Sequence, residues 1–85
     1  MTVELVITTH CPKCKLLKTW LEKRGVPFKV YNLDDPEDHS QLIMRDIYIV
    51  ETPVLIVNGK LYTTDSLFNE NGELNQNLMR EILEE

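Results

Sequence analysis

Short blocks of apolar residues alternate along the chain with clusters of proline, glycine and asparagine. Two of the blocks, residues 5–7 and 54–57, are apolar throughout, which is typical of strands buried on both faces of a sheet. Elsewhere apolar residues recur every three or four positions, the spacing of a helix with one buried face. The pattern predicts strands at 3–9, 28–31, 54–57 and 60–63, and helices at 12–24, 36–48 and 73–83.

The residues between the blocks support these boundaries. Gly25 is a usual residue after a helix, and Pro27 prevents that helix from continuing. Asp35 is expected to cap the second helix, with Pro36 at its first position. The pair Asn58-Gly59, flanked by apolar residues, predicts a hairpin.

Two further expectations concern side chains. Asp65 is expected to cap a short turn that runs through Phe68. The buried helix faces are expected to carry Leu17, Trp20 and Leu21, then Leu42, Ile43 and Ile47, and finally Leu74, Leu78 and Ile82.

The order of the elements is βαβαββα. Two strands joined by a helix form a parallel pair with a right-handed crossover, and the hairpin adds an antiparallel edge strand. The sheet is therefore mixed, and helices must cover both of its faces because the central strands are apolar throughout. We expect a single α/β domain over residues 1–85.

Composition and charge exclude several functions. The 85 residues carry a net charge of −5, which argues against a nucleic-acid partner. No apolar run approaches the ~20 residues of a membrane span, and the first ten residues lack the features of a signal peptide. We therefore expect a cytoplasmic protein with no membrane partner. In that compartment two cysteines are redox-active or metal-binding more often than a permanent crosslink.

Both cysteines of the chain lie in Cys11-Pro12-Lys13-Cys14, where the first strand passes into the first helix. Pro12 suits the first helical position, so Cys11 is expected at the N-cap and Cys14 one turn later, a spacing that permits a disulfide. The free N–H groups of the first turn and Lys13 favour a thiolate, lowering the pKa of Cys11 from ~8.5 toward neutrality. Cys14 is expected to be more buried and to attack a mixed disulfide on Cys11. The alternative is two unrelated structural cysteines.

Other polar residues near this motif allow two interpretations each. His10 can donate a proton or tune the thiolate, or it can be a solvated loop residue. The basic residues of the first helix form either a docking patch for an acidic partner or a solvated face, and they are Lys13, Lys15, Lys18, Lys23 and Arg24.

A C-x-x-C motif after the first strand of such a unit resembles the thioredoxin fold, and further motifs resemble the glutaredoxin family more closely. The motifs are Cys11-Pro12-Lys13-Cys14, Thr52-Pro53, Asn58-Gly59-Lys60, Asp65-Ser66-Leu67 and Asn71-Gly72-Glu73-Leu74. The resemblance covers nearly the whole chain. It implies a sheet of order 2-1-3-4 and a cis Pro53 beside the cysteines. The backbone of Thr52 would then pair with an extended substrate.

The resemblance also implies a glutathione site, which the sequence retains only in part. Glutaredoxins usually carry a lysine three residues before the first cysteine, where this chain has Thr8. They also carry paired glycines before an acidic residue, where this chain has Thr63-Thr64. Asp65 and Ser66 remain as candidates to hold a glutathione carboxylate, although Asp65 is equally suited to be a helix N-cap.

By this resemblance we expect a dithiol–disulfide oxidoreductase, an electron carrier in cell redox homeostasis that reduces protein disulfides through Cys11 and Cys14. It would act as a monomer with no bound cofactor, recharged by glutathione or by a reductase. The alternative is a module that binds a metal or an iron–sulfur cluster through the same thiolates. That function needs ligands from a second chain or from glutathione, because only His10 lies near the cysteine pair.

Overall fold

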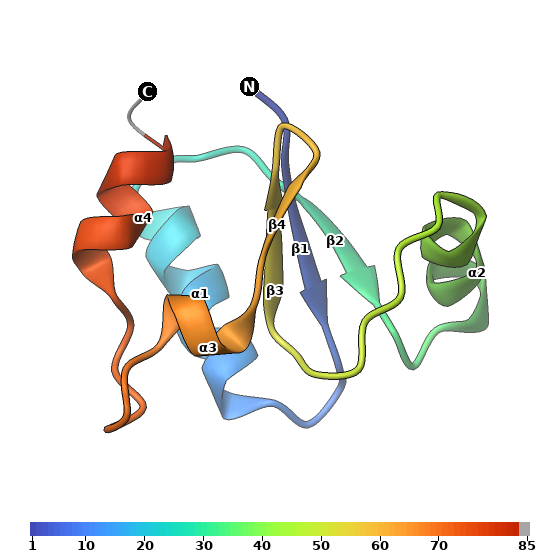
Figure 1. The fold of residues 1–85 in the computed structure, drawn as a ribbon, viewed down its shortest axis with the longest axis horizontal. Helices are drawn as coiled ribbons and strands as arrows, with labels where there is room; N and C mark the ends of the chain where they lie inside the picture. The colour runs from blue at the N-terminus through green and yellow to red at the C-terminus, as the bar shows by residue number, and fades with distance from the viewer. Residues whose placement is uncertain (84–85) are drawn as a thin grey trace.

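The computed structural model describes residues 1–83, and its elements alternate between strands and helices along most of the chain (Figure 1). The strands are β1 (Val3–Ile7), β2 (Lys29–Asn32), β3 (Val54–Val57) and β4 (Lys60–Tyr62). The helices are α1 (Pro12–Lys23), α2 (Pro36–Met44), α3 (Thr64–Leu67) and α4 (Gln76–Leu83). All strands and long helices predicted from the sequence are present.

The four strands form one mixed sheet of order β2-β1-β3-β4. Strand β1 is parallel to β2, with Val6 opposite Tyr31, and antiparallel to β3, with Leu5 opposite Leu55. Strands β3 and β4 form the predicted hairpin, and Asn58 adopts a positive φ of 52° in its turn. The predicted strand order is thus confirmed.

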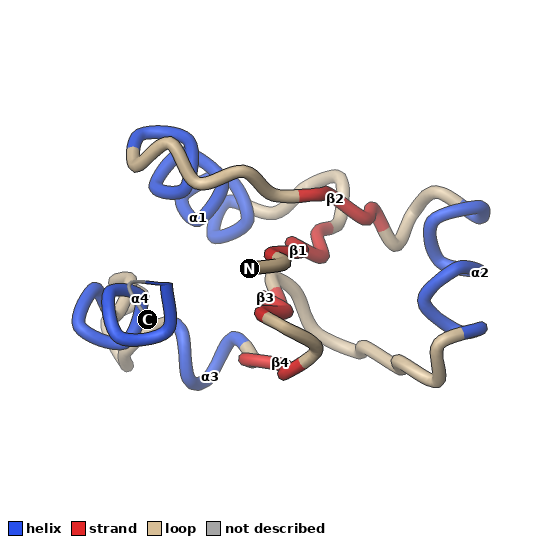
Figure 2. The backbone as a smooth tube through the Cα atoms, turned by 90° about the horizontal axis from the view of Figure 1, so that it is seen from above, coloured by secondary structure: helices blue, strands red, loops and turns tan. Residues whose placement is uncertain are grey.

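Helices cover both faces of the sheet (Figure 2). Helices α1, α3 and α4 lie on one face, over a core cluster that contains Leu5, Leu17, Leu55 and Met79. Helix α2 lies alone on the other face, over a smaller cluster that contains Val6 and Leu42. Because adjacent residues of a strand point to opposite faces, the unbroken apolar runs of β1 and β3 supply both clusters.

Helix α2 is shorter than predicted, and one of its side chains faces outward. It ends at Met44, and Ile43 is 41% exposed, whereas Leu42 is fully buried. Asp46 takes a positive φ of 60°, its N–H bonds Ile43, and the N–H of Ile47 bonds Leu42. These two hydrogen bonds form a Schellman motif, which ends the helix. Ile47 still packs in the smaller cluster, but after the helix and not within it.

Other predicted boundaries also differ. Strand β1 ends at Ile7 and not at residue 9. Thr63, not Asp65, is the N-cap residue of α3, and it makes no side-chain capping bond. Helix α4 begins at Gln76 because Leu74 instead bridges to Phe68 in an extended conformation. The side chain of Asn75 then accepts the N–H of Leu78, as a capping residue does.

One ion pair joins α2 to the sheet. Glu4 lies in β1, 7% exposed, and Arg45 directly after α2 donates two hydrogen bonds to its carboxylate, at 2.7 and 3.0 Å. The hydrogen bond and charge of Arg45 hold the pKa of Glu4 below its ordinary value, although burial acts in the opposite direction. The pair therefore fastens the C-terminal end of α2 to the central strand.

Over residues 1–83, none of the helices is long and apolar enough to cross a bilayer. The longest, α1, has 12 residues, and its apolar residues alternate with lysines.

Candidate active site

The loop between β1 and α1 places Cys11 at the start of the helix. Cys11 is the N-cap residue, with extended φ and ψ of −143° and 99°, and Pro12 is the first helical residue. The Cys11 sulfur accepts the N–H of Cys14 at 3.1 Å, one of the first-turn donors that lack a partner within the helix. The predicted cap position of Cys11 is therefore confirmed.

Cys11 and Cys14 form a disulfide, with their Cα atoms 5.2 Å apart. The two sulfurs differ in their surroundings. Cys14 is 3% exposed and packs on the buried side of α1, whereas Cys11 is half-buried at the surface. An incoming group therefore reaches Cys11 first.

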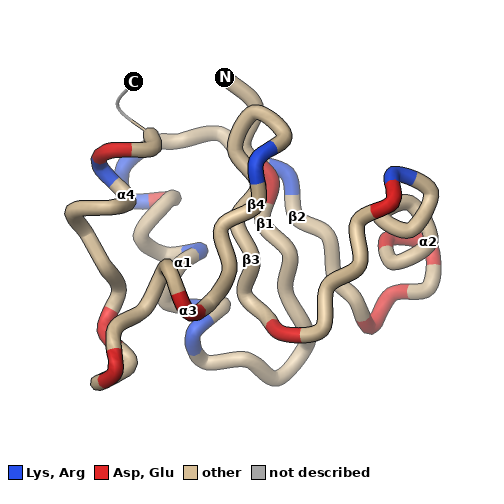
Figure 3. The backbone as a smooth tube through the Cα atoms, in the orientation of Figure 1, with Lys and Arg blue, Asp and Glu red and all other residues tan. Residues whose placement is uncertain are grey.

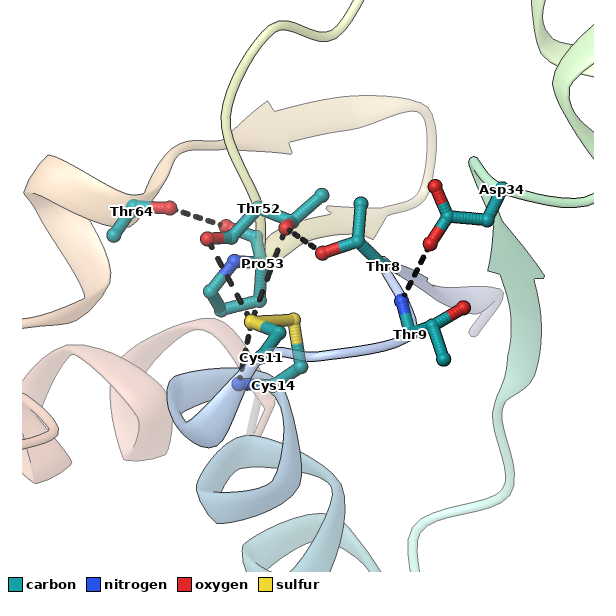
Figure 4. Close-up of a disulfide and its surroundings, with 8 residues drawn as sticks. All are labelled: Thr8, Thr9, Cys11, Cys14, Asp34, Thr52, Pro53 and Thr64. Carbon is teal, nitrogen blue, oxygen red and sulfur yellow. Dashed lines mark hydrogen bonds between the residues drawn. A yellow bond between two sulfur atoms is a disulfide. The ribbon is translucent and has the colours of Figure 1, made fainter.

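The segment before β3 lies against this disulfide (Figure 4). The peptide bond between Thr52 and Pro53 is cis, as the resemblance implies. The Thr52 carbonyl oxygen and hydroxyl lie 3.9 and 3.8 Å from the Cys11 sulfur. The hydroxyl of Thr64 donates to the carbonyl of Pro53 at 2.7 Å, which fixes this segment from the far side. Backbone and hydroxyl groups thus surround the sulfur that an incoming group would meet.

Hydroxyls also connect the two loops of the site. The Thr8 and Thr52 hydroxyls are 2.9 Å apart and hydrogen-bonded to each other, which joins the end of β1 to the segment before β3. The N–H of Thr9 donates to the Asp34 carboxylate at 2.8 Å, and this bond lowers the pKa of Asp34. Both contacts hold the loop that precedes Cys11 (Figure 4).

These contacts are not evident from the sequence. Thr8 and Thr52 are 44 positions apart, and Thr9 and Asp34 are 25 apart. Threonine and aspartate are common loop residues, so only the three-dimensional arrangement shows their roles. The strand order 2-1-3-4, which brings the ends of β1, β2 and the start of β3 together, was the available signal.

The remaining candidate residues surround the disulfide at different depths. His10 is exposed and, with Thr9, Cys11, Pro12 and Lys15, lines a hollow of about 410 Å³ beside Cys11. The ammonium group of Lys13 lies 5.5 Å from the centre of the Phe68 ring. Asp65 and Ser66 are exposed in α3, while Thr64 is buried with its hydroxyl bound to Pro53.

The donor set near the disulfide is small. Within residues 1–83, no three or more His, Cys, Asp and Glu side chains are grouped so that they could hold a metal ion. The chain has two cysteines, and a tetrahedral zinc or iron–sulfur site usually takes four ligands. A metal held here would need ligands from outside the described residues.

The sheet order, the helices on both faces and the disulfide at the start of α1 define the thioredoxin-like fold. Residues 3–62 match the glutaredoxin family model, and the chain belongs to this family. The resemblance found in the sequence is thereby confirmed. Among curated proteins, none matches the sequence significantly.

Solved structures support the fold. The thioredoxin-like protein BC3987 shares 18% identity and a TM-score of 0.67, over 96% of this chain and all of its own. A glutaredoxin from Archaeoglobus fulgidus shares 22% identity and a TM-score of 0.65, over 98% of this chain and 86% of its own. Glutaredoxin 1 from Francisella tularensis, complexed with cacodylate, shares 21% identity and a TM-score of 0.53, over 71% and 78%.

Proposed function

We propose that the protein reduces disulfide bonds in other proteins through a dithiol cycle of Cys11 and Cys14. The observation that carries the proposal is the asymmetry of the pair. Cys11 caps the helix at the surface, while Cys14 is 3% exposed behind it. Membership of the glutaredoxin family supports the same chemistry.

The cycle begins with both cysteines reduced. The Cys11 thiolate attacks one sulfur of the substrate disulfide, so that a mixed disulfide forms and the other substrate sulfur leaves as a thiolate. Cys14 then loses its proton to solvent or to the leaving thiolate and attacks the Cys11 sulfur. The substrate leaves fully reduced with two electrons, and the protein holds the Cys11–Cys14 disulfide seen in the structure.

The start of α1 assists both steps. The N–H of Cys14 already points at the Cys11 sulfur, so a thiolate there gains a hydrogen bond without any rearrangement. The Thr52 hydroxyl supplies a second donor at 3.8 Å. Both groups stabilise the thiolate relative to the thiol, which favours Cys11 as nucleophile and as leaving group.

Substrate docking is proposed at Thr52. Within residues 1–83, neither its N–H nor its carbonyl pairs with another backbone group. An extended substrate segment can therefore pair with Thr52 as an added strand and bring its sulfur to Cys11. His10, Pro53 and the Thr64–Ser66 segment would surround this substrate.

Recharging is proposed to depend on a protein reductase more than on glutathione. Thr8 stands where the family usually has a lysine, and its hydroxyl is bound to Thr52. Thr63 and Thr64 add side chains where the family usually has bare backbone. A metal or iron–sulfur function has no comparable support, because within residues 1–83 the cysteine pair belongs to no group of three or more His, Cys, Asp and Glu side chains.

Trapping of the mixed disulfide tests the proposal. Cys14→Ser should accumulate complexes between Cys11 and a disulfide-containing protein such as oxidised insulin, released by dithiothreitol. Cys11→Ser, the matched control, should trap nothing. Full insulin reduction by Cys14→Ser, or equal trapping by both variants, would contradict the dithiol cycle.

A further inference from the structure

The charge of the chain is divided between its two parts. Residues 1–33 contain six lysines and arginines against two acidic residues, whereas residues 34–85 contain three against twelve. Figure 3 shows the basic residues of α1 on one side of the sheet, while acidic residues lie around α2 on the other side and also along α3 and α4 on the α1 side. A protein with a net charge of −5 thus presents a basic surface, and that surface begins at Cys11.

The outer face of α1 carries a regular stripe of residues. They recur at intervals of three or four positions, so they lie in one line along the helix. We call this line the α1 stripe, and it comprises Pro12, Lys15, Leu16, Thr19, Trp20 and Lys23. The opposite face of α1 is buried and holds Cys14, Leu17 and Leu21.

Two apolar side chains form the middle of the stripe, and the Arg24 guanidinium lies 4.5 Å from the centre of the Trp20 ring. Leu16 is 54% exposed, and Trp20 is only partly buried although it packs at the edge of the main core. Burying such surface under a partner favours binding because apolar area is removed from water. Large exposed apolar side chains within a charged border are typical of a contact surface.

The stripe is hollowed along its length. The hollow at Cys11 shares Pro12 and Lys15 with a second hollow of about 320 Å³, which extends past Leu16 to Lys23. From Pro12 to Lys23 the helix rises about 16 Å, the length of roughly five extended residues. An extended segment that starts at the reacting sulfur can therefore follow the whole stripe.

The cations of the stripe are available to a partner. Lys15 and Lys23 are exposed, and neither forms an ion pair within the described part of the chain. They stand on the border of the same hollow, which has Leu16 and Trp20 between them. The arrangement complements acidic side chains about two helical turns apart, with apolar side chains between them.

We propose that the α1 stripe is a docking surface for the substrate protein. It receives an extended segment next to the target disulfide, in which acidic residues meet Lys15 and Lys23 and apolar residues cover Leu16 and Trp20. The inference rests on the proposed dithiol function and names its substrate class: protein disulfides beside acidic, apolar sequence.

Two synthetic peptides test the proposal. Both carry the same intramolecular disulfide and the same leucine and phenylalanine residues, and they differ only in having glutamates or lysines beside them. The reduced protein should reduce the acidic peptide about five- to tenfold faster at low ionic strength, and the ratio should approach one as salt is added. The ratio is informative because any change in the reactivity of the Cys11 thiolate cancels.

Matched variants locate the effect. Lys15→Glu combined with Lys23→Glu should remove or reverse the preference for the acidic peptide. Lys18→Glu combined with Lys60→Glu makes the same charge change outside the stripe. This variant should keep most of the preference for the acidic peptide. A preference that survives in the first variant, or disappears equally in both, overturns the proposal.

Two further outcomes are distinct. Equal rates of the wild-type protein with both peptides overturn the docking surface alone, whereas reduction of neither peptide overturns the proposed function as well. Sedimentation at low salt tests whether a second copy of this chain binds the stripe. A salt-sensitive dimer that Lys15→Glu/Lys23→Glu abolishes would assign the stripe to the acidic surface of a second copy and overturn the proposal.

Discussion

At the scale of single residues, the two cysteines have the same chemistry and different positions. Cys11 is at the surface with two hydrogen-bond donors aimed at its sulfur, and Cys14 is enclosed by the core side of α1. Reactivity of a thiol depends on its thiolate fraction and on access, and both favour Cys11. The function of the site is therefore set by geometry more than by residue type.

This difference predicts selective alkylation. With limiting iodoacetamide at near-neutral pH, the reduced protein should be labelled at Cys11 at least tenfold faster than at Cys14. Peptide mass spectrometry measures the two rates, and the same experiment in urea should remove most of the difference. Equal labelling in the folded protein would refute the assignment of Cys11 as nucleophile.

The Thr52 hydroxyl is expected to stabilise the Cys11 thiolate. Thr52→Val retains the side-chain shape but cannot donate a hydrogen bond, so the pKa of the Cys11 thiol should rise. The rate at which Cys11 reacts at near-neutral pH should then fall severalfold. Titration of thiolate absorbance in the ultraviolet measures the pKa. Thr52→Ser, which keeps the hydroxyl, is the control and should leave the pKa close to that of the wild type.

At the scale of elements, local sequence predicts a helix end only when the residue there has a strong preference. Gly25 ends α1 in a Schellman motif, with Val26 bonded to Leu21, and glycine at this position is readily recognised. Asp46 ends α2 with the same pair of bonds, but aspartate seldom adopts positive φ. The predicted α2 was therefore one turn too long. Ile43 was also predicted to face the core, but it is 41% exposed.

The same comparison predicts a stabilising substitution. Asp46→Gly should raise the free energy of unfolding by roughly 0.5–1 kcal/mol, because a positive φ strains a residue that carries a Cβ atom. Urea denaturation measures the change. Asp65→Gly, within α3, is the control and should lower stability by a similar amount, since glycine weakens a helix interior. A loss of stability in Asp46→Gly would contradict the argument.

Features that depend on contacts between different segments were harder to place. Leu74 has the spacing of a helical residue, yet it bridges to Phe68, and α4 begins only at Gln76. Similarly, the Thr8–Thr52 and Thr64–Pro53 hydrogen bonds join segments that approach each other only when the sheet forms. By contrast, Cys11-Pro12-Lys13-Cys14 is a local signal, and its helix-start geometry was fully predictable.

At the scale of the whole molecule, the Glu4–Arg45 pair makes stability depend on pH. The folded pKa of Glu4 lies below its ordinary value of 4.5, so its contribution is present above that pH and is lost as pH falls through the folded pKa. Glu4→Gln should therefore reduce the free energy of unfolding by about 1.5–3 kcal/mol at pH 7, and by less at pH values below ~4.

Urea denaturation of both proteins at several pH values measures this difference. Exposed Glu51 provides the control, and Glu51→Gln should change stability little at any pH. A Glu4→Gln deficit that stays constant down to the acid transition would show that packing of the side chain, and not its charge, holds α2 to the sheet.

The last prediction at this scale concerns the electron donor that reduces the Cys11–Cys14 disulfide. Thr8 supplies no cation for a glutathione carboxylate, and a hydrogen bond to a charged group contributes roughly 1.5–3 kcal/mol. Lys13, the nearest candidate to replace it, holds its ammonium group 5.5 Å from the centre of the Phe68 ring. Losing one hydrogen bond between a cation and the glutathione carboxylate weakens glutathione binding by on the order of ten- to a hundredfold. We therefore expect slow reduction of the Cys11–Cys14 disulfide by glutathione with glutathione reductase, and faster reduction by thioredoxin reductase with NADPH.

Thr8→Lys makes the cause testable, because it adds the missing cation at the end of β1. Its glutathione-dependent turnover should exceed that of the wild type by about tenfold, with little change in the reductase-coupled assay. Thr8→Val is the control, since it breaks the hydrogen bond to Thr52 without adding charge and should not raise glutathione turnover. An equal gain in both variants would assign the effect to release of Thr52, and no gain in Thr8→Lys would mean that the carboxylate is held by other residues.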